Sequence, residues 1–237
     1  MKLLAFELST EACSVALHVE GQVRERFEIA PRRHAALALP WAEELLAEAG
    51  IVRSQLDAIA LGRGPGAFTG VRLAIALAQG IALALDRPLL PVSTLQALAM
   101  RAPADEDRIL SAIDARMGEL YVARFERVDG LPVACGAERV CGPEAVQLPA
   151  GLPVYGVGTG FAALDAALVG QLGGALRGHD AGALPRASDV LALAAPSFAR
   201  GEGVAPERVE PAYLRDNVAL TLVEQQALRA AKAKANG

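Results

Sequence analysis

The sequence between residues 56 and 85, LDAIALGRGPGAFTGVRLAIALAQGIALAL, decides the fold because it places a strand, a glycine-rich loop and a helix in immediate succession. Residues 56–61 form a short apolar run, which is typical of a buried strand. Residues 71–85 contain a single charged residue, Arg72, and predict an apolar helix. A strand that leads through a loop into a helix is typical of sheets covered by helices.

The chain before this unit predicts three strands and a helix. Continuous or alternating apolar residues mark the strands, at 2–8, 12–19 and 22–29. Glu20-Gly21 supplies a tight turn between the second and third strands. The predicted helix covers 39–49 and has Pro40 in its first turn, where proline is tolerated.

The second half of the chain opens in the same way as the first thirty residues. An apolar strand at 109–113 ends at Asp114, a second strand follows at 119–125, and Asp129 starts a turn. The first strand of the chain also ends near an acid, Glu7. Two interpretations fit this similarity: a diverged duplication of one β-β-β-α unit, or two hairpins that are similar by chance.

A duplicated unit with an acid at the end of its first strand resembles the superfamily of actin, Hsp70 and the sugar kinases, which has a ribonuclease H-like fold and closes two halves around ATP. The resemblance implies an α/β, actin-like fold with two lobes, each a mixed sheet covered by helices. We expect a first lobe at 1–102 that carries the partner-binding helices, a second, smaller lobe at 108–219, and a C-terminal helix or tail at 220–237.

The composition excludes several classes of protein. With 237 residues, 53% of them hydrophobic, the chain can bury one large core or two smaller ones. The longest apolar run, 73–85, is shorter than the roughly 20 residues of a membrane-spanning helix, and the N-terminus lacks a signal-peptide pattern. Three cysteines without CxxC spacing fit free thiols in a reducing compartment.

We expect a cytoplasmic protein with no membrane segment. Its net charge of −4 predicts weak RNA binding by the chain alone.

The glycine-rich stretches have two interpretations each. The loop Gly62–Gly70 leads into a helix N-terminus and could hold an anion, but no Gly-Lys-Ser/Thr closes it as in a Walker A loop. A structural turn that needs positive φ at its glycines is the alternative. The stretch 156–160 follows an apolar strand without the GxGxxG spacing, so it is a strand-to-helix turn or an adenosine contact.

Residues for metal or nucleophilic catalysis do not form a recognisable pattern. His18, His34 and His179 lie on different predicted elements, and we expect no metal site, with His34 at the surface. Cys13 lies inside a predicted strand, and no serine or cysteine has a recognisable base. We therefore expect no catalytic residue.

The glycine loop also belongs to a set of motifs. Gly64–Arg72 reads GPGAFTGVR and resembles the GPGSFTGLR signature of the TsaB family, the dimerisation subunit of bacterial tRNA threonylcarbamoyladenosine synthesis. Four further segments are similar to family motifs and follow the family's order: Glu7–Thr10 with Cys13–Leu17, Pro91–Leu95, Ile113–Arg116 with Gly118–Tyr121, and Pro211–Arg215 with Val218-Ala219. The chain thus resembles the TsaB family from residue 7 to residue 219.

The resemblance implies a non-catalytic subunit of the machine that modifies adenosine 37 of tRNA. It would support the catalytic paralogue TsaD together with the ATPase TsaE, and form a homodimer when alone. It would meet tRNA only through the complex, and ATP and metal would belong to the partner subunits. Glu7 replaces the aspartate of ATP-using relatives, and Ala38 replaces the second histidine of the TsaD HxxxH motif, which His34 would start. The alternatives are an ATP-dependent kinase-like or peptidase-like enzyme of the superfamily.

The resemblance places the partner interface on the first two helices. The expected interface residues are Leu37, Trp41, Leu45, Ala74, Ile75, Ala78 and Ala82. The second helix is apolar nearly all round, so burial against its own sheet is the alternative for this helix. Glu7, Gly64, Gly66 and Gly158 are expected as vestigial nucleotide contacts, as the superfamily implies.

Overall fold

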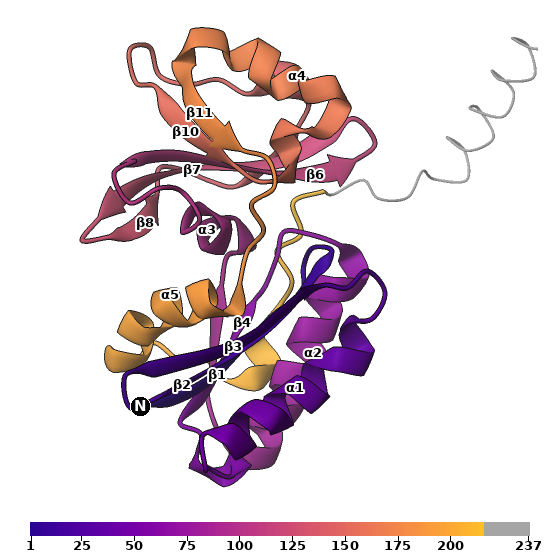
Figure 1. Cartoon of the computed structure of the whole chain (residues 1–237), viewed down its shortest axis with the longest axis vertical. Coiled ribbons are helices and arrows are strands. Elements are labelled where there is room, and N and C mark those ends of the chain that lie inside the picture. Colours follow the sequence, from indigo (N-terminus) through magenta and orange to yellow (C-terminus); the bar gives the residue numbers. More distant parts are fainter. Residues whose placement is uncertain (216–237) are drawn as a thin grey trace, which may run out of the picture.

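The computed structural model describes residues 1–215 and shows two lobes, each built on its own sheet (Figure 1). The first sheet has five strands in the order β3-β2-β1-β4-β5. The strands are β1 (Lys2–Glu7), β2 (Ala12–Val19), β3 (Gln22–Ile29), β4 (Ala58–Gly62) and β5 (Leu89–Val92). The first three form an antiparallel meander, and β4 and β5 run parallel to β1. The strands predicted at 2–8, 12–19 and 22–29 are confirmed to within one residue at their ends, and the strand predicted at 56–61 to within two.

The second sheet repeats this topology. Its order is β11-β10-β6-β7-β8, and β9 pairs with β7. The strands are β6 (Arg108–Arg116), β7 (Glu119–Val128), β8 (Leu131–Ala134), β9 (Arg139–Cys141), β10 (Val154–Val157) and β11 (Leu176–Asp180). An antiparallel meander is again followed by two strands parallel to the first of the meander. The matching order and directions favour the interpretation of a diverged duplication.

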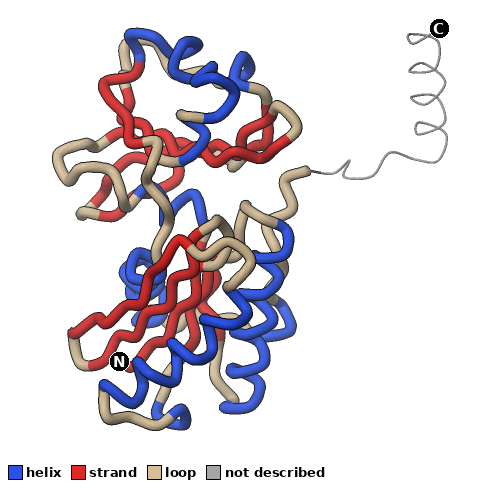
Figure 2. Tube along the Cα trace, turned by 45° about the vertical axis from the view of Figure 1, so that its right-hand side comes forward, coloured by secondary structure: helices blue, strands red, loops and turns tan. Residues whose placement is uncertain are grey.

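Helices cover both faces of the first sheet (Figure 2). Alternate side chains of a strand point to opposite faces, so Leu4 and Phe6 of β1 join the core under α1 (His34–Glu48) and α2 (Phe68–Leu85). Leu3 and Ala5 join the core under α5 (Ala187–Ala199). The remaining helices are α3 (Thr94–Ala99) and α4 (Ala163–Leu172), with short 3₁₀ turns at Arg53–Gln55, Pro143–Ala145, Thr159–Phe161, Gly173–Ala175 and Pro206–Arg208.

The lobes exchange their last helices. α3 follows the first sheet in the chain but packs on β6, β7 and β8, whereas α5 follows the second sheet and packs on the first. The segment expected to form the second lobe, 108–219, therefore divides in space after β11. The expected tail at 220–237 and the motif residues Val218-Ala219 lie outside the described residues.

The start of α1 differs from the sequence prediction. The helix begins at His34 instead of residue 39, so Pro40 lies inside it and not in its first turn. A proline in a helix removes the hydrogen bond to the carbonyl four residues earlier, here that of Ala36. Both Ala36 and Pro40 are exposed, so water can solvate the freed carbonyl. The helix tolerates the proline because it falls on the solvent side.

The apolar helix α2 is long and apolar enough to cross a membrane by length and composition alone. The side of α2 that faces the first sheet is buried and consists of Gly70, Val71, Ala74, Ile75, Ala78 and Ala82. This packing gives its hydrophobicity a role in the core of the first lobe.

Candidate functional site

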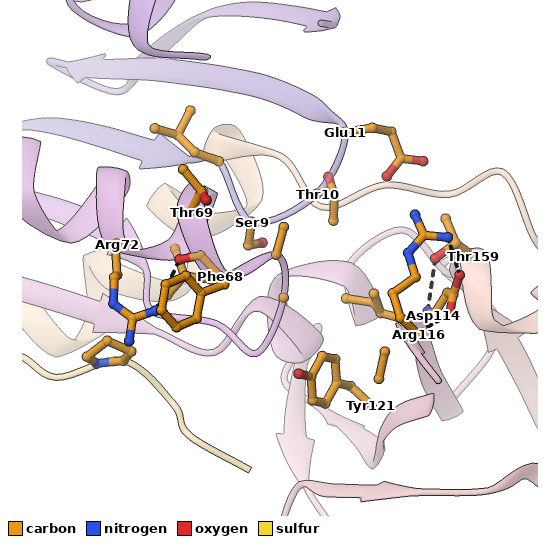
Figure 3. A pocket seen from close by; sticks show the side chains of 18 of the residues that line it. Ser9, Thr10, Glu11, Phe68, Thr69, Arg72, Asp114, Arg116, Tyr121 and Thr159 are labelled. Carbon is orange, nitrogen blue, oxygen red and sulfur yellow. Dashed lines mark hydrogen bonds and ion pairs between the residues drawn. The ribbon is translucent and has the colours of Figure 1, made fainter. Parts of the chain in front are cut away.

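A cleft of about 1250 Å³ lies between the lobes. On one side it is lined by the turn after β1 (Leu8–Glu11) and by the loop and first turns of α2 (Gly66–Leu73). The opposite wall comes from the end of β6 (Ile113–Arg116) and from Thr159, as Figure 3 shows. The chain segment Pro211–Arg215 completes the lining. Four of the five quoted sequence motifs thus meet at one cleft.

The glycine loop packs its backbone directly against the turn after β1. A Cβ atom on Gly66 would lie 2.4 Å from the carbonyl oxygen of Ser9, and one on Gly70 would lie 2.0 Å from that of Leu8. The backbone N–H of Ala67 donates to the Ser9 carbonyl at 2.7 Å. These glycines allow close approach of two backbone segments, which favours a structural role for the loop.

Glu7 is closed off from the cleft. Its side chain is 1% exposed and accepts hydrogen bonds from the Ser9 backbone N–H at 2.8 Å, from the Ser9 hydroxyl, and from the Thr94 hydroxyl at 3.2 Å. Desolvation by burial raises the pKa of this carboxyl above its usual value, although the bonds from Ser9 and Thr94 oppose the shift. The carboxylate thus joins the end of β1 to the turn that follows it and to the start of α3.

The acid on the opposite wall is neutralised by a neighbour. Asp114 accepts from the backbone N–H and from Nη1 of Arg116, both at 2.8 Å. The backbone N–H of Asp114 donates to the hydroxyl of Thr159 at 3.2 Å. With Glu7 buried and Asp114 paired, the two strand-end acids expected from the duplication do not face each other across an open site.

Arginines outnumber acids in the lining of the cleft. The four arginines are Arg32, Arg72, Arg116 and Arg215, and the two acids are Glu11 and Asp114. The cleft is therefore locally positive in a chain whose net charge is −4. Arg72 and Arg215 are not among the sequence-predicted site residues. Both arginines lie inside the quoted motifs. Arg72 donates a hydrogen bond to the hydroxyl of Tyr213, a contact that no local sequence pattern predicts.

The expected vestigial nucleotide contacts are not brought together. Of the four, Gly66 lines the cleft, whereas Glu7, Gly64 and Gly158 do not. Gly64 has a φ of 94° and its carbonyl accepts from the Thr94 N–H at 2.9 Å. Gly158 has a φ of 109°, and a Cβ there would lie 2.4 Å from the Ala112 carbonyl oxygen. Gly64 and Gly158 are turn residues with positive φ, and a nucleotide contact at these positions stays a prediction.

The histidine and cysteine side chains have structural surroundings. His34 is half-buried, not at the surface as expected, and its Nε2 lies 3.1 Å from the carbonyl oxygens of both Thr10 and Ala12. It fastens the start of α1 to the turn after β1. Within residues 1–215, no group of three His, Cys, Asp or Glu side chains is placed to hold a metal. Burial raises the pKa of the Cys13 thiol to about 12, helped by the charge of Glu28, which opposes thiolate chemistry.

Most of the expected interface residues belong to the core. Leu45, Ala74, Ala78 and Ala82 are fully buried and Ile75 is 6% exposed, all in the cluster between the helices and the first sheet. The side chain of a fully buried residue has no surface to offer to a partner. These five residues are buried against the chain's own sheet, as the alternative interpretation predicts.

Leu37 and Trp41 are half-buried beside strand β3. They share a stripe of α1 with Glu44 and Glu48, since residues three or four positions apart lie on one side of a helix. Arg26 of β3 forms an ion pair with Glu44 at 3.5 Å and another with Glu48, which places this stripe against β3. The predicted apolar face is thus a flank of the core, to which both residues contribute contacts.

The outer face of α2 is the apolar surface that remains. We define it by the residues on the side of the helix opposite the sheet: Leu73, Ala76, Leu77, Gly80, Leu83 and Ala84. Leu83 is 64% exposed, and Leu39 of the neighbouring helix α1 is 42% exposed. No charged residue lies on this outer face, which is unusual for a helix side that meets water.

Comparisons with known proteins agree over nearly the whole chain. The family model described as TsaD, tRNA N6-adenosine threonylcarbamoyltransferase, matches residues 27–222. The tRNA threonylcarbamoyladenosine biosynthesis protein TsaB of Escherichia coli K12 is 42% identical over 226 residues, which cover 92% of this chain and 96% of that protein. The protein of the same name from Haemophilus influenzae is 38% identical over 230 residues, covering 92% and 95%.

A solved structure gives the same result for the fold. The crystal structure of a Pseudomonas aeruginosa protein, described as similar to the peptidase YeaZ, superposes with a TM-score of 0.84 at 46% identity. The superposition covers 90% of this chain and 99% of that one. A second structure, YeaZ from Pseudomonas aeruginosa, gives the same values.

Proposed function

Because the chain belongs to the TsaB family of tRNA threonylcarbamoyladenosine biosynthesis proteins, we propose that it is the non-catalytic subunit that binds and supports the TsaD transferase. Participation in the synthesis of threonylcarbamoyladenosine in tRNA follows from the family. The role as partner and not as catalyst is our proposal, and it rests on the surface and the cleft of this chain.

The outer face of α2 is the observation that carries the proposal. An apolar helix face on a protein surface costs free energy unless something covers it. α1 and α2 are in contact, and Leu39 of α1 is also exposed. Two helices of the paralogue laid against α1 and α2 would cover it in a four-helix contact. A stable interface of this kind buries roughly 1,600 Å² in total.

The cleft supports a role without chemistry. Catalysis by an actin-like enzyme would need a carboxylate that reaches the ligand. Glu7 is held under the glycine loop by Ser9 and Thr94, and Asp114 is bound by Arg116. An ATP-dependent kinase-like or a peptidase-like enzyme is the alternative function, and it predicts turnover by the chain alone.

The remaining partners follow from the same role. TsaE would join the complex of this chain with TsaD, and tRNA would bind through the complex. A second copy of the chain would cover the outer face of α2 when TsaD is absent. ATP and metal would be held by the partner subunits, and the complex would act in the cytoplasm.

Binding of the full chain to the TsaD protein of the same organism tests the proposal. We expect Leu83→Asp to weaken binding at least about tenfold, because it places a charge inside an apolar contact (1.4 kcal/mol corresponds to a factor of ten). The measurement is isothermal titration calorimetry. Val133→Asp is the matched control, since Val133 is 49% exposed on the second lobe, away from α2.

Two results would contradict the proposal. Unchanged affinity of Leu83→Asp, in a variant with a wild-type circular dichroism spectrum, would place the interface elsewhere. Sustained ATP hydrolysis or tRNA modification by the purified chain alone would favour the enzymatic alternative.

A further inference from the structure

The last described segment of the chain, residues 204–215, forms a strap along α2. Val204 and Leu89 exchange two backbone hydrogen bonds of 2.9 Å. The amide nitrogen of Gln79 on α2 donates to the carbonyl of Pro206 at 2.8 Å and to that of Val209 at 3.3 Å. The first half of the strap is thus bound to the first lobe.

The strap stays on the first lobe as far as Tyr213. The backbone N–H of Ala212 donates to the carbonyl of Arg63 at 2.9 Å. Arg72 in the first turns of α2 donates to the Tyr213 hydroxyl. Its guanidinium lies 3.2 Å from the ring centre of Phe68 and 5.2 Å from that of Tyr213, so the arginine holds both rings.

Two residues later the strap reaches the second lobe. Nη2 of Arg215 donates to the carbonyl of Ala115 at 3.2 Å and to that of Arg116 at 3.4 Å, and it binds the carboxylate of Glu119. The side chain of Arg215 is 17% exposed. One arginine therefore binds both strands of the β6–β7 hairpin, next to its turn.

The hairpin turn that Arg215 holds has a costly backbone. Arg116, Met117 and Gly118 have φ values of 65°, 58° and 80°. The first two are not glycines, and such residues persist in this region only where the surroundings hold them. The carbonyl of Arg116 belongs to this turn, so the bond from Arg215 is part of what holds it.

The lobes also meet through α3, outside the cleft lining. α3 packs on β6 and β7 of the second lobe, and at its start the Thr94 hydroxyl donates to Glu7 of the first lobe at 3.2 Å. In Figure 1, α3 lies to the left of the space between the lobes, and the yellow strap lies to its right. The start of α3 and the strap thus both join the lobes, and of the two only the strap lines the cleft.

We propose that Tyr213–Arg215 is a latch that fixes the width of the cleft and couples α2 to the second lobe. Tyr213 is anchored on α2 through Arg72, and Arg215 grips the hairpin, so the two lobes move as one body while the latch is closed. This gives the PAYLR motif at 211–215 a role that the partner-binding proposal does not use. It concerns the free chain, so it stands or fails independently of TsaD binding.

Hydrogen–deuterium exchange of the full chain tests the latch. In Arg215→Ala we expect the amides of residues 114–119 to exchange about tenfold faster or more, since a side chain that makes several charge-assisted hydrogen bonds is lost. The amides of β1 and β4 should keep their wild-type rates. Arg200→Ala is the matched control: Arg200 also pairs with a glutamate, Glu202 at 2.6 Å, but both residues belong to the same short segment.

A second variant separates the latch from a general loss of stability. Arg215→Lys keeps the positive charge but cannot bind two carbonyls and a carboxylate in one planar arrangement, so its hairpin exchange should lie between wild type and Arg215→Ala. Wild-type exchange at 114–119 in Arg215→Ala would overturn the proposal. Equal acceleration in β1 and β4 would overturn it too, because Arg215 would then stabilise the whole fold.

Discussion

On α2, Ala76 and Ala78 are the same residue two positions apart, but Ala78 is fully buried under the helix and Ala76 is exposed on its outer face. Both faces are apolar, yet they meet opposite surroundings. The inner face packs against β1 and β4 of the first sheet. The outer face has no neighbour in residues 1–215 that covers Leu83. Hydrophobicity alone does not separate a core face from a binding face; only the position of the sheet does.

The largest difference between the faces should appear when each alanine is replaced by arginine. Ala78→Arg buries an unpaired charge in a packed core and should lower the free energy of unfolding by at least about 4 kcal/mol. Ala76→Arg adds a solvated side chain and should change it by no more than about 0.5 kcal/mol. Urea unfolding followed by circular dichroism measures both. A folded Ala78→Arg protein with near wild-type stability would show that the inner face is not the core.

The two faces of α2 also mark the limit of what the sequence could predict. The first three strands were predicted to within one residue, because alternation and the Glu20-Gly21 turn are local signals. The inner and outer faces of α2 could not be distinguished, because assigning a face requires a polar side, and Arg72 and Gln79 are too few to mark one. On α1 the apolar spacing of Leu37 and Trp41 predicts a partner face, although the same stripe continues into Glu44 and Glu48.

The other residues of the candidate site are positioned by contacts between segments that lie far apart in the sequence. Glu7 was expected near a ligand because of its place at the end of β1, but the hydroxyl of Thr94, 87 positions later, holds its carboxyl. Arg215 and the hairpin it binds are about 100 positions apart. No local pattern connects such pairs. The exchange of α3 and α5 between the lobes was beyond the sequence for the same reason.

The free energy of unfolding should depend on pH through Glu7, which lies on the inner side of the loop that leads into α2. Glu7 packs against Gly62, where a Cβ atom would lie 1.8 Å from its carboxylate. Because burial raises the folded pKa above the unfolded one, the wild type has its full stability below the usual pKa of 4.5. It loses stability as the pH rises, until the folded pKa is passed. The free energy of unfolding falls by about 1.4 kcal/mol for each pH unit that separates the unfolded pKa from the folded pKa.

Glu7→Gln removes this ionisation and keeps an oxygen that accepts from Ser9. We expect the variant to lose less stability than the wild type between pH 4.5 and pH 8, as measured by thermal unfolding. Asp57→Asn is the control, because the side chain of Asp57 is 44% exposed and its carboxylate pairs with the N-terminal ammonium at 3.9 Å. If stability falls equally with pH in Glu7→Gln and in the wild type, ionisation of Glu7 costs no folding free energy. That result is expected of a carboxylate that faces a ligand.

The smallest effect should come from two glycines on the two sides of α2. Gly80 lies on the outer face, and a Cβ there would meet nothing within 4 Å. Gly80→Ala should stabilise the free chain by about 0.5–1 kcal/mol, because glycine is a poor helix former. Gly70→Ala should destabilise it by about 1–3 kcal/mol, since its Cβ would overlap the Leu8 carbonyl. Thermal unfolding gives both signs.

The partner proposal adds a further expectation for Gly80→Ala. If a helix of TsaD packs closely over the outer face, the added methyl group should weaken binding even though the free chain is more stable. A variant that is more stable and binds TsaD as well as the wild type would restrict the contact to the ends of the outer face, near Leu73 and Leu83.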